Sequence, residues 1–142
     1  MPIRVYIVED HPVMRETLVA YLGLSPDIEL CGMASTAEEA SEQIEASDPS
    51  LVLLDLSLPG RSGLDLLSEI TQRWQYPCVI LSGHGEQGHV GRAFAAGARG
   101  YVLKGTPHEV PVAIRSVMDG QVFLSDSLRK SLDYADRGGF DR

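Results

Sequence analysis

Short apolar runs alternate along the chain with segments in which apolar residues recur at the helical period. The runs span residues 3–8, 28–33, 51–54, 78–81 and 101–103, and each has a length suited to a buried strand. The segments between them repeat apolar residues three or four positions apart, which is typical of helices that bury one face. This alternation of strand and helix predicts an α/β domain built on a mostly parallel sheet.

Capping residues mark where the predicted helices begin and end. Pro12 suits the first turn of a helix that Gly23 ends. Thr36 and Glu39 have the spacing of a capping box, and Ser62 is placed to cap the following helix. We therefore expect one helix after each of the first three strands.

Two later segments fit the helical pattern less well. Several glycines lie between residues 83 and 97, and each glycine inside a helix costs about 1 kcal/mol relative to alanine. The short helix expected there should be the easiest to displace. Thr106 and Glu109 form a second capping box, but Pro111 lacks the N–H that should reach back to Pro107. The last helix of the sheet therefore begins late or has a distorted first turn.

The C-terminal segment differs in pattern from the rest of the chain. The sheet domain is expected to span residues 1–120, because a glycine there ends its last helix. Three leucines then recur at helical spacing from Leu124, with Ser125 placed as their N-cap, and residues 133–142 are polar. Residues 121–142 are accordingly predicted to form a linker with one short helix and a disordered tail.

Four of the five predicted strands end in a polar residue that can take part in chemistry. The first ends in Glu9 and Asp10, the third in Asp55, the fourth in Ser82 and the last in Lys104. The carboxyl ends of parallel strands lie along one edge of a sheet, where open α/β folds bind their ligands. These side chains are therefore expected to converge on one shallow site. The second strand has no such residue and is expected at the outer edge of the sheet.

Three carboxylates in one site repel one another unless a cation binds their oxygens. Mg²⁺ is the expected ion, because it prefers carboxylate oxygens and keeps several of its waters. Aspartate is a recognised nucleophile in phosphoryl transfer, and a metal offsets the negative charge of the incoming group. An ammonium such as that of Lys104 can contact a phosphoryl oxygen. The residues thus predict that a carboxylate accepts a phosphoryl group.

Composition narrows the choice of partners and location. The 142 residues suffice for one well-buried core, and 12 basic against 20 acidic residues give a net charge of −8. An acidic chain without a basic cluster is a poor direct partner for nucleic acid. The first residues contain no apolar run long enough for a signal sequence or a membrane span, so we expect a cytoplasmic protein that does not bind membranes.

The cysteines and histidines indicate no site of their own. Cys31 and Cys78 lie in strand-like runs without a neighbouring ligand and are expected to be free thiols. None of the 4 histidines forms a helical metal-binding pair. His11 follows the acidic pair, and we interpret it as an exposed residue rather than as a phosphohistidine.

Four motifs, taken in their order and spacing, resemble those of a known family. They are Val8-Glu9-Asp10-His11-Pro12, Leu54-Asp55-Leu56-Ser57-Leu58-Pro59-Gly60 with Gly63, Ile80-Leu81-Ser82-Gly83, and Gly97-Ala98-Arg99-Gly100-Tyr101-Val102-Leu103-Lys104. From about residue 3 to residue 120 the chain resembles the receiver domain of two-component response regulators, and in particular the NarL/FixJ/LuxR-type subfamily. The resemblance implies a flavodoxin-like receiver fold, with a doubly wound sheet of five parallel strands in the order 2-1-3-4-5.

The resemblance also implies a role for each residue of the predicted site. Asp55 matches the phosphoacceptor, and Lys104 matches the lysine that contacts the phosphoryl group. Glu9 and Asp10 would hold Mg²⁺ together with Asp55 and the backbone carbonyl of Ser57. Proline after this lysine is common in the wider superfamily, whereas this chain has Gly105. Such departures are frequent in the subfamily, and they leave the peptide geometry at Lys104 open.

Four further positions match residues that control the state of the family's site. Ser82 matches the switch hydroxyl that moves toward the phosphoryl group, and Tyr101 matches the aromatic residue that changes rotamer with it. Ser57 and His84 match positions that tune how long the phosphoryl group survives, that is, the rate of dephosphorylation.

The resemblance further implies the partners. A histidine kinase would donate the phosphoryl group in a phosphorelay, and the chain would catalyse only its own phosphorylation and slow dephosphorylation, so it is expected to be a signalling phosphoprotein and not an enzyme. Members of the subfamily usually continue into a helix-turn-helix domain that binds DNA and regulates transcription. Here DNA would be reached only through an output domain outside this chain. Homodimerisation through the first and last helices is also suggested.

Two alternatives differ in class. A Mg²⁺-dependent aspartyl-phosphate hydrolase of the haloacid dehalogenase type also places an aspartate nucleophile at a strand end. Those enzymes need a second aspartate two residues further on, where this chain has Ser57, and a cap domain for which the chain is short. The other alternative is a receiver-like interaction module that works without phosphorylation, and the intact set of acidic residues argues weakly against it.

Overall fold

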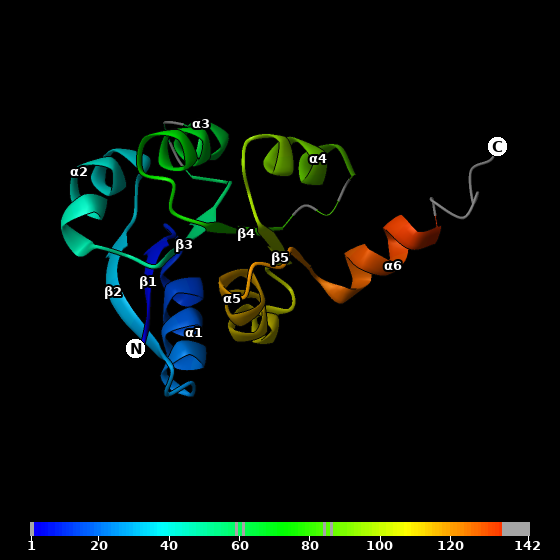
Figure 1. Ribbon diagram of the computed structural model, residues 1–142, viewed down its shortest axis with the longest axis horizontal. Helices are drawn as coiled ribbons and strands as arrows, with labels where there is room; N and C mark the ends of the chain where they lie inside the picture. The colour runs from blue at the N-terminus through cyan, green and yellow to red at the C-terminus, as the bar shows by residue number, and fades with distance from the viewer. Residues whose placement is uncertain (1, 59, 61, 84, 86, 135–142) are drawn as a thin grey trace.

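The centre of the molecule is a parallel sheet. The computed structural model describes residues 2–58, 60, 62–83, 85 and 87–134. The strands of the sheet are β1 (Ile3–Val8), β2 (Ile28–Ala34), β3 (Leu51–Asp55), β4 (Cys78–Ser82), β5 (Gly100–Leu103) and β6 (Phe123–Leu124). They lie in the order β2-β1-β3-β4-β5-β6, and every neighbouring pair is parallel (Figure 1). The predicted α/β fold and the edge position of the second strand are confirmed.

Helices cover both faces of this sheet. They are α1 (Pro12–Gly23), α2 (Ala37–Ser47), α3 (Gly63–Glu69), α4 (Gln87–Ala95), α5 (Val110–Met118) and α6 (Asp126–Tyr134). The first and fifth helices lie on one face, while α2, α3 and α4 lie on the other (Figure 1). A π-helical turn, Ile70–Trp74, continues α3, and a 3-10 turn, Pro107–Glu109, precedes α5.

β3 is buried along its whole length because it lies between β1 and β4 and has helices on both faces. Val52 and Leu54 belong to the core cluster under α2, α3 and α4, whereas Leu51 and Leu53 belong to the cluster under α1 and α5. This central strand ends in Asp55. The carboxylate therefore lies at the middle of the sheet's carboxyl edge.

β6 is a departure from the predicted five-stranded sheet. The Phe123 N–H donates to the Arg99 carbonyl at 3.0 Å, and the Ser125 N–H donates to the Tyr101 carbonyl at 2.9 Å. A strand of two residues shows no alternation that a sequence pattern can detect. It forms because the chain after α5 returns past the edge of β5, whose backbone groups would otherwise lack strand partners.

Two predicted helix caps are confirmed. The Glu39 N–H donates to Thr36 Oγ1 at 3.1 Å, and the Leu64 N–H donates to Ser62 Oγ at 3.1 Å. The Glu39 carboxylate departs from the pattern of a capping box, because it accepts from the Ser35 N–H at 2.7 Å. The cap residue thus follows from local sequence, while the partner of the acidic side chain does not.

The predicted capping box at the last helix of the sheet is wrong. The Thr106 side chain caps no backbone N–H, and its hydroxyl donates instead to the Glu109 carboxylate at 2.8 Å. The expected late start is confirmed, since the regular helix begins at Val110 after the 3-10 turn. Pro111 then lies in the first turn, where a missing N–H breaks no helical hydrogen bond.

α6 packs against the edge of the domain. Ser125 precedes this helix as predicted, but its Oγ accepts from the Leu103 N–H at 2.9 Å. Leu128 is buried and packs in the same core cluster as Tyr101. A Cβ on Gly85 would lie 2.9 Å from Leu128 Cδ2, so the β4–α4 loop approaches α6 closely. The helix includes the first two residues of the predicted tail, and residues 135–142 lie outside the described part of the chain.

Glu109 ties the start of α5 to α6, which leads to a pH-dependence prediction. Burial raises the pKa of its carboxyl, but hydrogen bonds from Ser125, the Asp126 N–H and Thr106 outweigh that effect, and the pKa lies below its ordinary value. A carboxylate with a lowered pKa stabilises the fold above its ordinary range and loses this contribution as the pH falls through the lowered pKa.

The Glu109→Gln protein is therefore expected to be less stable than the wild type at neutral pH. The difference in unfolding free energy should shrink as the pH falls below about 4, because both proteins then carry an uncharged group. Urea denaturation across this pH range measures the difference. Glu42→Gln, at an exposed position of α2, is the matched control. A constant difference down to the lowest pH would contradict the role given to the Glu109 charge.

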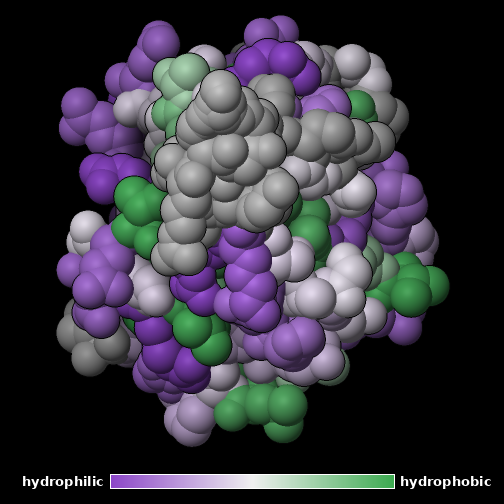
Figure 2. Space-filling view, turned by 90° about the vertical axis from the view of Figure 1, so that its right-hand side faces the viewer, coloured by the Kyte–Doolittle hydropathy of each residue, from purple (hydrophilic) through white to green (hydrophobic). Residues whose placement is uncertain are grey.

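Within the described residues, none of the helices is long and apolar enough to cross a bilayer. Figure 2 shows the side of the molecule that carries α6, where hydrophobic residues are scattered among hydrophilic ones. Cys31 and Cys78 are free thiols, as predicted.

Candidate functional site

The acidic and basic residues of the predicted site converge at the carboxyl edge of the sheet. Glu9 follows β1, Asp55 ends β3 and Ser82 ends β4, while Lys104 follows β5. Glu9, Asp55 and Ser82 are buried, and Asp10 is partly exposed. The structure thus brings together the residues that the strand ends predicted.

Lys104 connects two carboxylates that belong to different strands. Its Nζ lies 3.0 Å from Asp55 Oδ2 and 3.4 Å from Glu9 Oε1. The Lys104 side chain is 18% exposed and the side chains of both acidic residues are fully buried, so the lysine reaches the site from its solvent side. The backbone holds it there, because the Lys104 N–H donates to the Ser82 carbonyl at 2.9 Å.

Asp55 combines burial with a nearby like charge. Burial raises the pKa of its carboxyl, and the Glu9 carboxylate raises it further. The Ser57 N–H, which donates to Asp55 Oδ1 at 2.9 Å, and Lys104 act in the opposite direction but do not cancel the rise. Without a further cation, the ionised site is therefore electrostatically unfavourable.

The carboxylate oxygens of this site suit a divalent cation. Glu9 Oε1, Asp10 Oδ1 and Asp55 Oδ2 are buried and accept no hydrogen bond, although Lys104 lies within ion-pair distance of two of them. Unsatisfied buried oxygens of this kind are costly unless they coordinate an ion. One ligand atom from each of the three carboxylates and from His11 lies within 4.8 Å of the others. The three carboxylate oxygens of this compact set fit the coordination sphere of Mg²⁺.

His11 is the site residue whose contacts were missed by the sequence analysis. Its side chain is 58% exposed, as expected, yet its Nδ1 lies 2.9 Å from Glu9 Oε2 and 3.3 Å from Asp10 Oδ1. The His11 N–H also donates to Glu9 Oε2 at 3.1 Å. A local signal existed, because the residue directly follows the acidic pair. The chain direction after Val8, which turns the imidazole back over Glu9, is not encoded in that spacing.

The residues assigned to switching and tuning lie around the same edge. Ser57 and Ser82 line a hollow of about 290 Å³ together with Arg92 and His89 of α4. Tyr101 is fully buried in the core cluster beneath α4. His84 lies outside the described residues.

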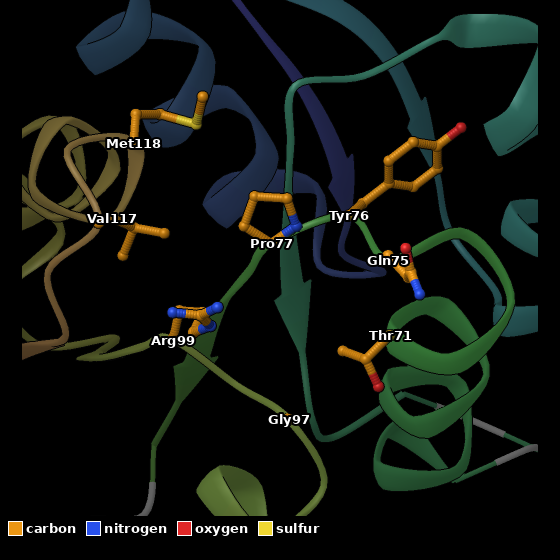
Figure 3. Close-up of a pocket in the computed structure, with 9 residues that line it drawn as sticks. Thr71, Gln75, Tyr76, Pro77, Gly97, Arg99, Val117 and Met118 are labelled. Carbon is orange, nitrogen blue, oxygen red and sulfur yellow. The ribbon is translucent and has the colours of Figure 1, made fainter.

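A second hollow, of about 400 Å³, lies at the opposite edge of the sheet (Figure 3). Pro77 and Arg99, which directly precede β4 and β5, line it together with Val117 and Met118 near the end of α5. It contains none of the acidic residues of the site, so the carboxyl edge remains the place for the predicted chemistry.

Comparison with known proteins identifies the family. The sequence model of the family described as the response regulator receiver domain matches residues 5–115. The chain therefore belongs to the receiver domains of two-component response regulators, which are signalling domains.

Sequence similarity to two bacterial regulatory proteins defines the subfamily. The chain is 37% identical over 128 residues to the transcriptional regulatory protein YhcZ of Bacillus subtilis, with 88% of this chain and 59% of that protein covered. It is 33% identical over 129 residues to the nitrate/nitrite response regulator NarL of Escherichia coli, covering 89% of this chain and 60% of NarL. The chain is a receiver domain of the NarL/LuxR type, and it spans about 60% of the length of these relatives.

Solved structures agree with this assignment. A LuxR-family two-component response regulator from Aurantimonas sp. superposes with a TM-score of 0.89 at 28% identity, covering 96% of this chain and 99% of that chain. The signal receiver domain of a NarL response regulator from Mycobacterium tuberculosis gives a TM-score of 0.78 at 31% identity, covering 84% and 98%. The flavodoxin-like receiver fold is confirmed, and the hydrolase and phosphorylation-independent alternatives are disfavoured.

Proposed function

We propose that Asp55 accepts a phosphoryl group from a histidine kinase and that this changes the state of the domain. The observation that carries the proposal is the buried Asp55 carboxylate, which has the Lys104 ammonium at 3.0 Å and lies beside Glu9 at the carboxyl edge of the sheet. An Asp55 oxygen would form a bond to phosphorus while the bond from phosphorus to the kinase histidine breaks, and the released imidazole takes up a proton.

Mg²⁺ would make this transfer feasible by offsetting negative charge on the phosphoryl group. Glu9, Asp10 and Asp55 would hold the ion with the backbone carbonyl of Ser57. Burial of two of these carboxylates and the absence of hydrogen bonds to three of their oxygens support that assignment. Lys104 would contact the phosphoryl oxygens, because its ammonium already lies beside the acceptor oxygen.

The phosphorylated carboxylate would act through the neighbouring strands. Phosphorylation adds about −1.5 to −2 charge and three strong acceptor oxygens. Ser82 ends the strand next to Asp55, and its hydroxyl would move toward these oxygens together with the loop that follows it. Tyr101 lies beside β4 on β5 and would repack with that movement. Ser57 and His84 would set how long the phosphoryl group survives.

The domain would act as part of a longer regulator. A DNA-binding output domain outside this chain would carry the signal to transcription, as the transcriptional relatives suggest. The chain would act in the cytoplasm without membrane contact and catalyse only its own phosphorylation and slow dephosphorylation. The exposed residues Val13 of α1 and Val112 of α5 are consistent with a homodimer through these helices.

Incubation with an acyl phosphate tests the phosphorylation directly. The wild-type protein is expected to gain one phosphoryl group in the presence of Mg²⁺, as read by intact mass. Addition of EDTA should abolish the gain, because the carboxylates then face the incoming phosphate without a compensating cation. Equal uptake with and without the chelator would contradict the metal's role, and no uptake in either case would contradict the proposed function.

A further inference from the structure

His11 brings a nitrogen ligand into an otherwise all-oxygen site. Its Nδ1 lies 2.9 Å from Glu9 Oε2, 3.3 Å from Asp10 Oδ1 and 3.9 Å from Asp55 Oδ2. The Lys104 Nζ is a long contact at 3.5 Å from the same nitrogen. The imidazole therefore faces all three carboxylates at once.

The 2.9 Å contact between His11 Nδ1 and Glu9 Oε2 is a hydrogen bond in this structure, and the same separations also suit ligand atoms that share one ion. Two atoms bound to an ion at about 2.1 Å lie about 3.0 Å apart at a right angle and about 3.4 Å apart at the tetrahedral angle. The distances from His11 Nδ1 to Glu9 and Asp10 match these values at 2.9 and 3.3 Å. A cation can thus contact His11, Glu9 and Asp10 with little rearrangement of their side chains.

The buried oxygens give an independent sign that the cluster binds a cation. Glu9 and Asp55 are fully buried, and each has one side-chain oxygen, Oε1 and Oδ2 respectively, that accepts no hydrogen bond. The nearest positive group to both is the Lys104 ammonium, at 3.4 and 3.0 Å. One lysine compensates only part of the charge of three carboxylates.

We propose that His11 is a ligand of this cation site and gives it a preference for late first-row divalent ions, represented by Zn²⁺, over Mg²⁺. The inference rests on the proposed function in so far as both require the carboxylates to bind a cation. Imidazole suits zinc, copper and nickel, whereas magnesium is bound mainly by oxygen. His11 would bind through Nδ1 as a neutral ring that carries its proton on Nε2, so bonds to the ion would replace the hydrogen bond between Nδ1 and Glu9 Oε2.

The consequence is competition between two metals at one site. Zn²⁺ held by His11, Glu9, Asp10 and Asp55 would exclude Mg²⁺ and occupy an oxygen of the phosphoacceptor. Free zinc would then reduce phosphoryl uptake, and the receiver would respond to transition-metal supply as well as to its kinase.

Calorimetric titration of Zn²⁺ and Mg²⁺ into the purified chain tests the preference. His11→Asn is expected to weaken Zn²⁺ binding by about tenfold or more, since even outer-shell partners of metal ligands are worth 10- to 100-fold in affinity. Mg²⁺ binding should change little. The substitution is expected to leave the fold intact, because the His11 side chain is 58% exposed. His108→Asn, which removes another exposed histidine, is the matched control and should leave both affinities unchanged.

Long-range ¹H–¹⁵N spectra of the histidine rings give a readout that does not depend on phosphorylation. The His11 resonances are assigned by their absence from the spectrum of His11→Asn. One equivalent of Zn²⁺ should shift the His11 Nδ1 resonance, whereas one equivalent of Mg²⁺ should leave it unchanged. An unchanged ratio of zinc to magnesium affinity in His11→Asn would overturn the inference, as would a zinc shift confined to other histidines. Magnesium-dependent phosphorylation would still uphold the proposed function in either case. A wild type that binds neither ion would overturn both.

Discussion

The Asp55→Asn protein is expected to take up no phosphoryl group from an acyl phosphate and Mg²⁺, under conditions where the wild type gains one. The amide that replaces the carboxylate has no nucleophilic oxygen of comparable strength, and it removes one ligand of the proposed metal. Intact mass measures the result. Asp119→Asn, at the exposed end of α5, is the control and should be phosphorylated like the wild type. Full uptake by Asp55→Asn would show that another residue is the acceptor.

The same substitution is expected to raise the free energy of unfolding at neutral pH when no divalent ion is added. The raised pKa of Asp55 means that burial and the Glu9 charge disfavour its ionised form in the folded state more than Lys104 and Ser57 favour it. An uncharged side chain removes that cost. Mg²⁺ should narrow the gap, because an ion that binds only the folded wild type stabilises it. Urea denaturation with and without Mg²⁺ compares the two proteins.

Gly63→Ala, at a buried position in the first turn of α3, is expected to lower the stability of the protein. A Cβ at this position would lie 2.6 Å from the Leu56 carbonyl oxygen and 2.7 Å from Leu56 Cα. These are backbone atoms, so relief requires a shift of the loop and costs about 2 kcal/mol. Phosphorylation should also slow, because Leu56 leads directly to Ser57, whose N–H holds Asp55 Oδ1.

Gly91→Ala is the matched control for this prediction. A Cβ there would meet no atom within 4 Å, and the residue lies inside α4. The change should stabilise the protein by about 0.5–1 kcal/mol, since alanine loses less backbone entropy in a helix. If both substitutions had the same effect in urea denaturation, the close approach of Gly63 to Leu56 would not be the cause of the loss.

The placement of the site follows from a simple property of parallel sheets. Glu9, Asp55, Ser82 and Lys104 each come at the carboxyl end of an apolar run, and these ends share one edge. No knowledge of side-chain positions is needed to bring them together. The ion pair between Lys104 and Asp55 confirms this convergence, because the two residues are 49 positions apart in the sequence.

Features that depend on distant packing were missed. β6 has no pattern of its own, and its two residues are strand only because β5 has an open edge. Thr106 looked like a helix cap, yet its hydroxyl bonds Glu109, whose carboxylate also receives the Asp126 N–H from α6. A capping pattern records which bonds are available locally and does not show which partner arrives from elsewhere in the chain.

The sequence by itself determined the α/β fold, the edge at which the reactive residues meet and the identity of the five groups that form the predicted centre, namely three carboxylates, a hydroxyl and an ammonium. Strand and helix periods, together with the residue that ends each strand, are local properties of the chain, and they suffice for this much. The tertiary structure alone decided that His11 faces the carboxylates, that α6 packs beside Tyr101 and that the chain adds a sixth strand. Those contacts depend on the direction in which loops leave the sheet, and that direction is fixed by packing between segments far apart in sequence.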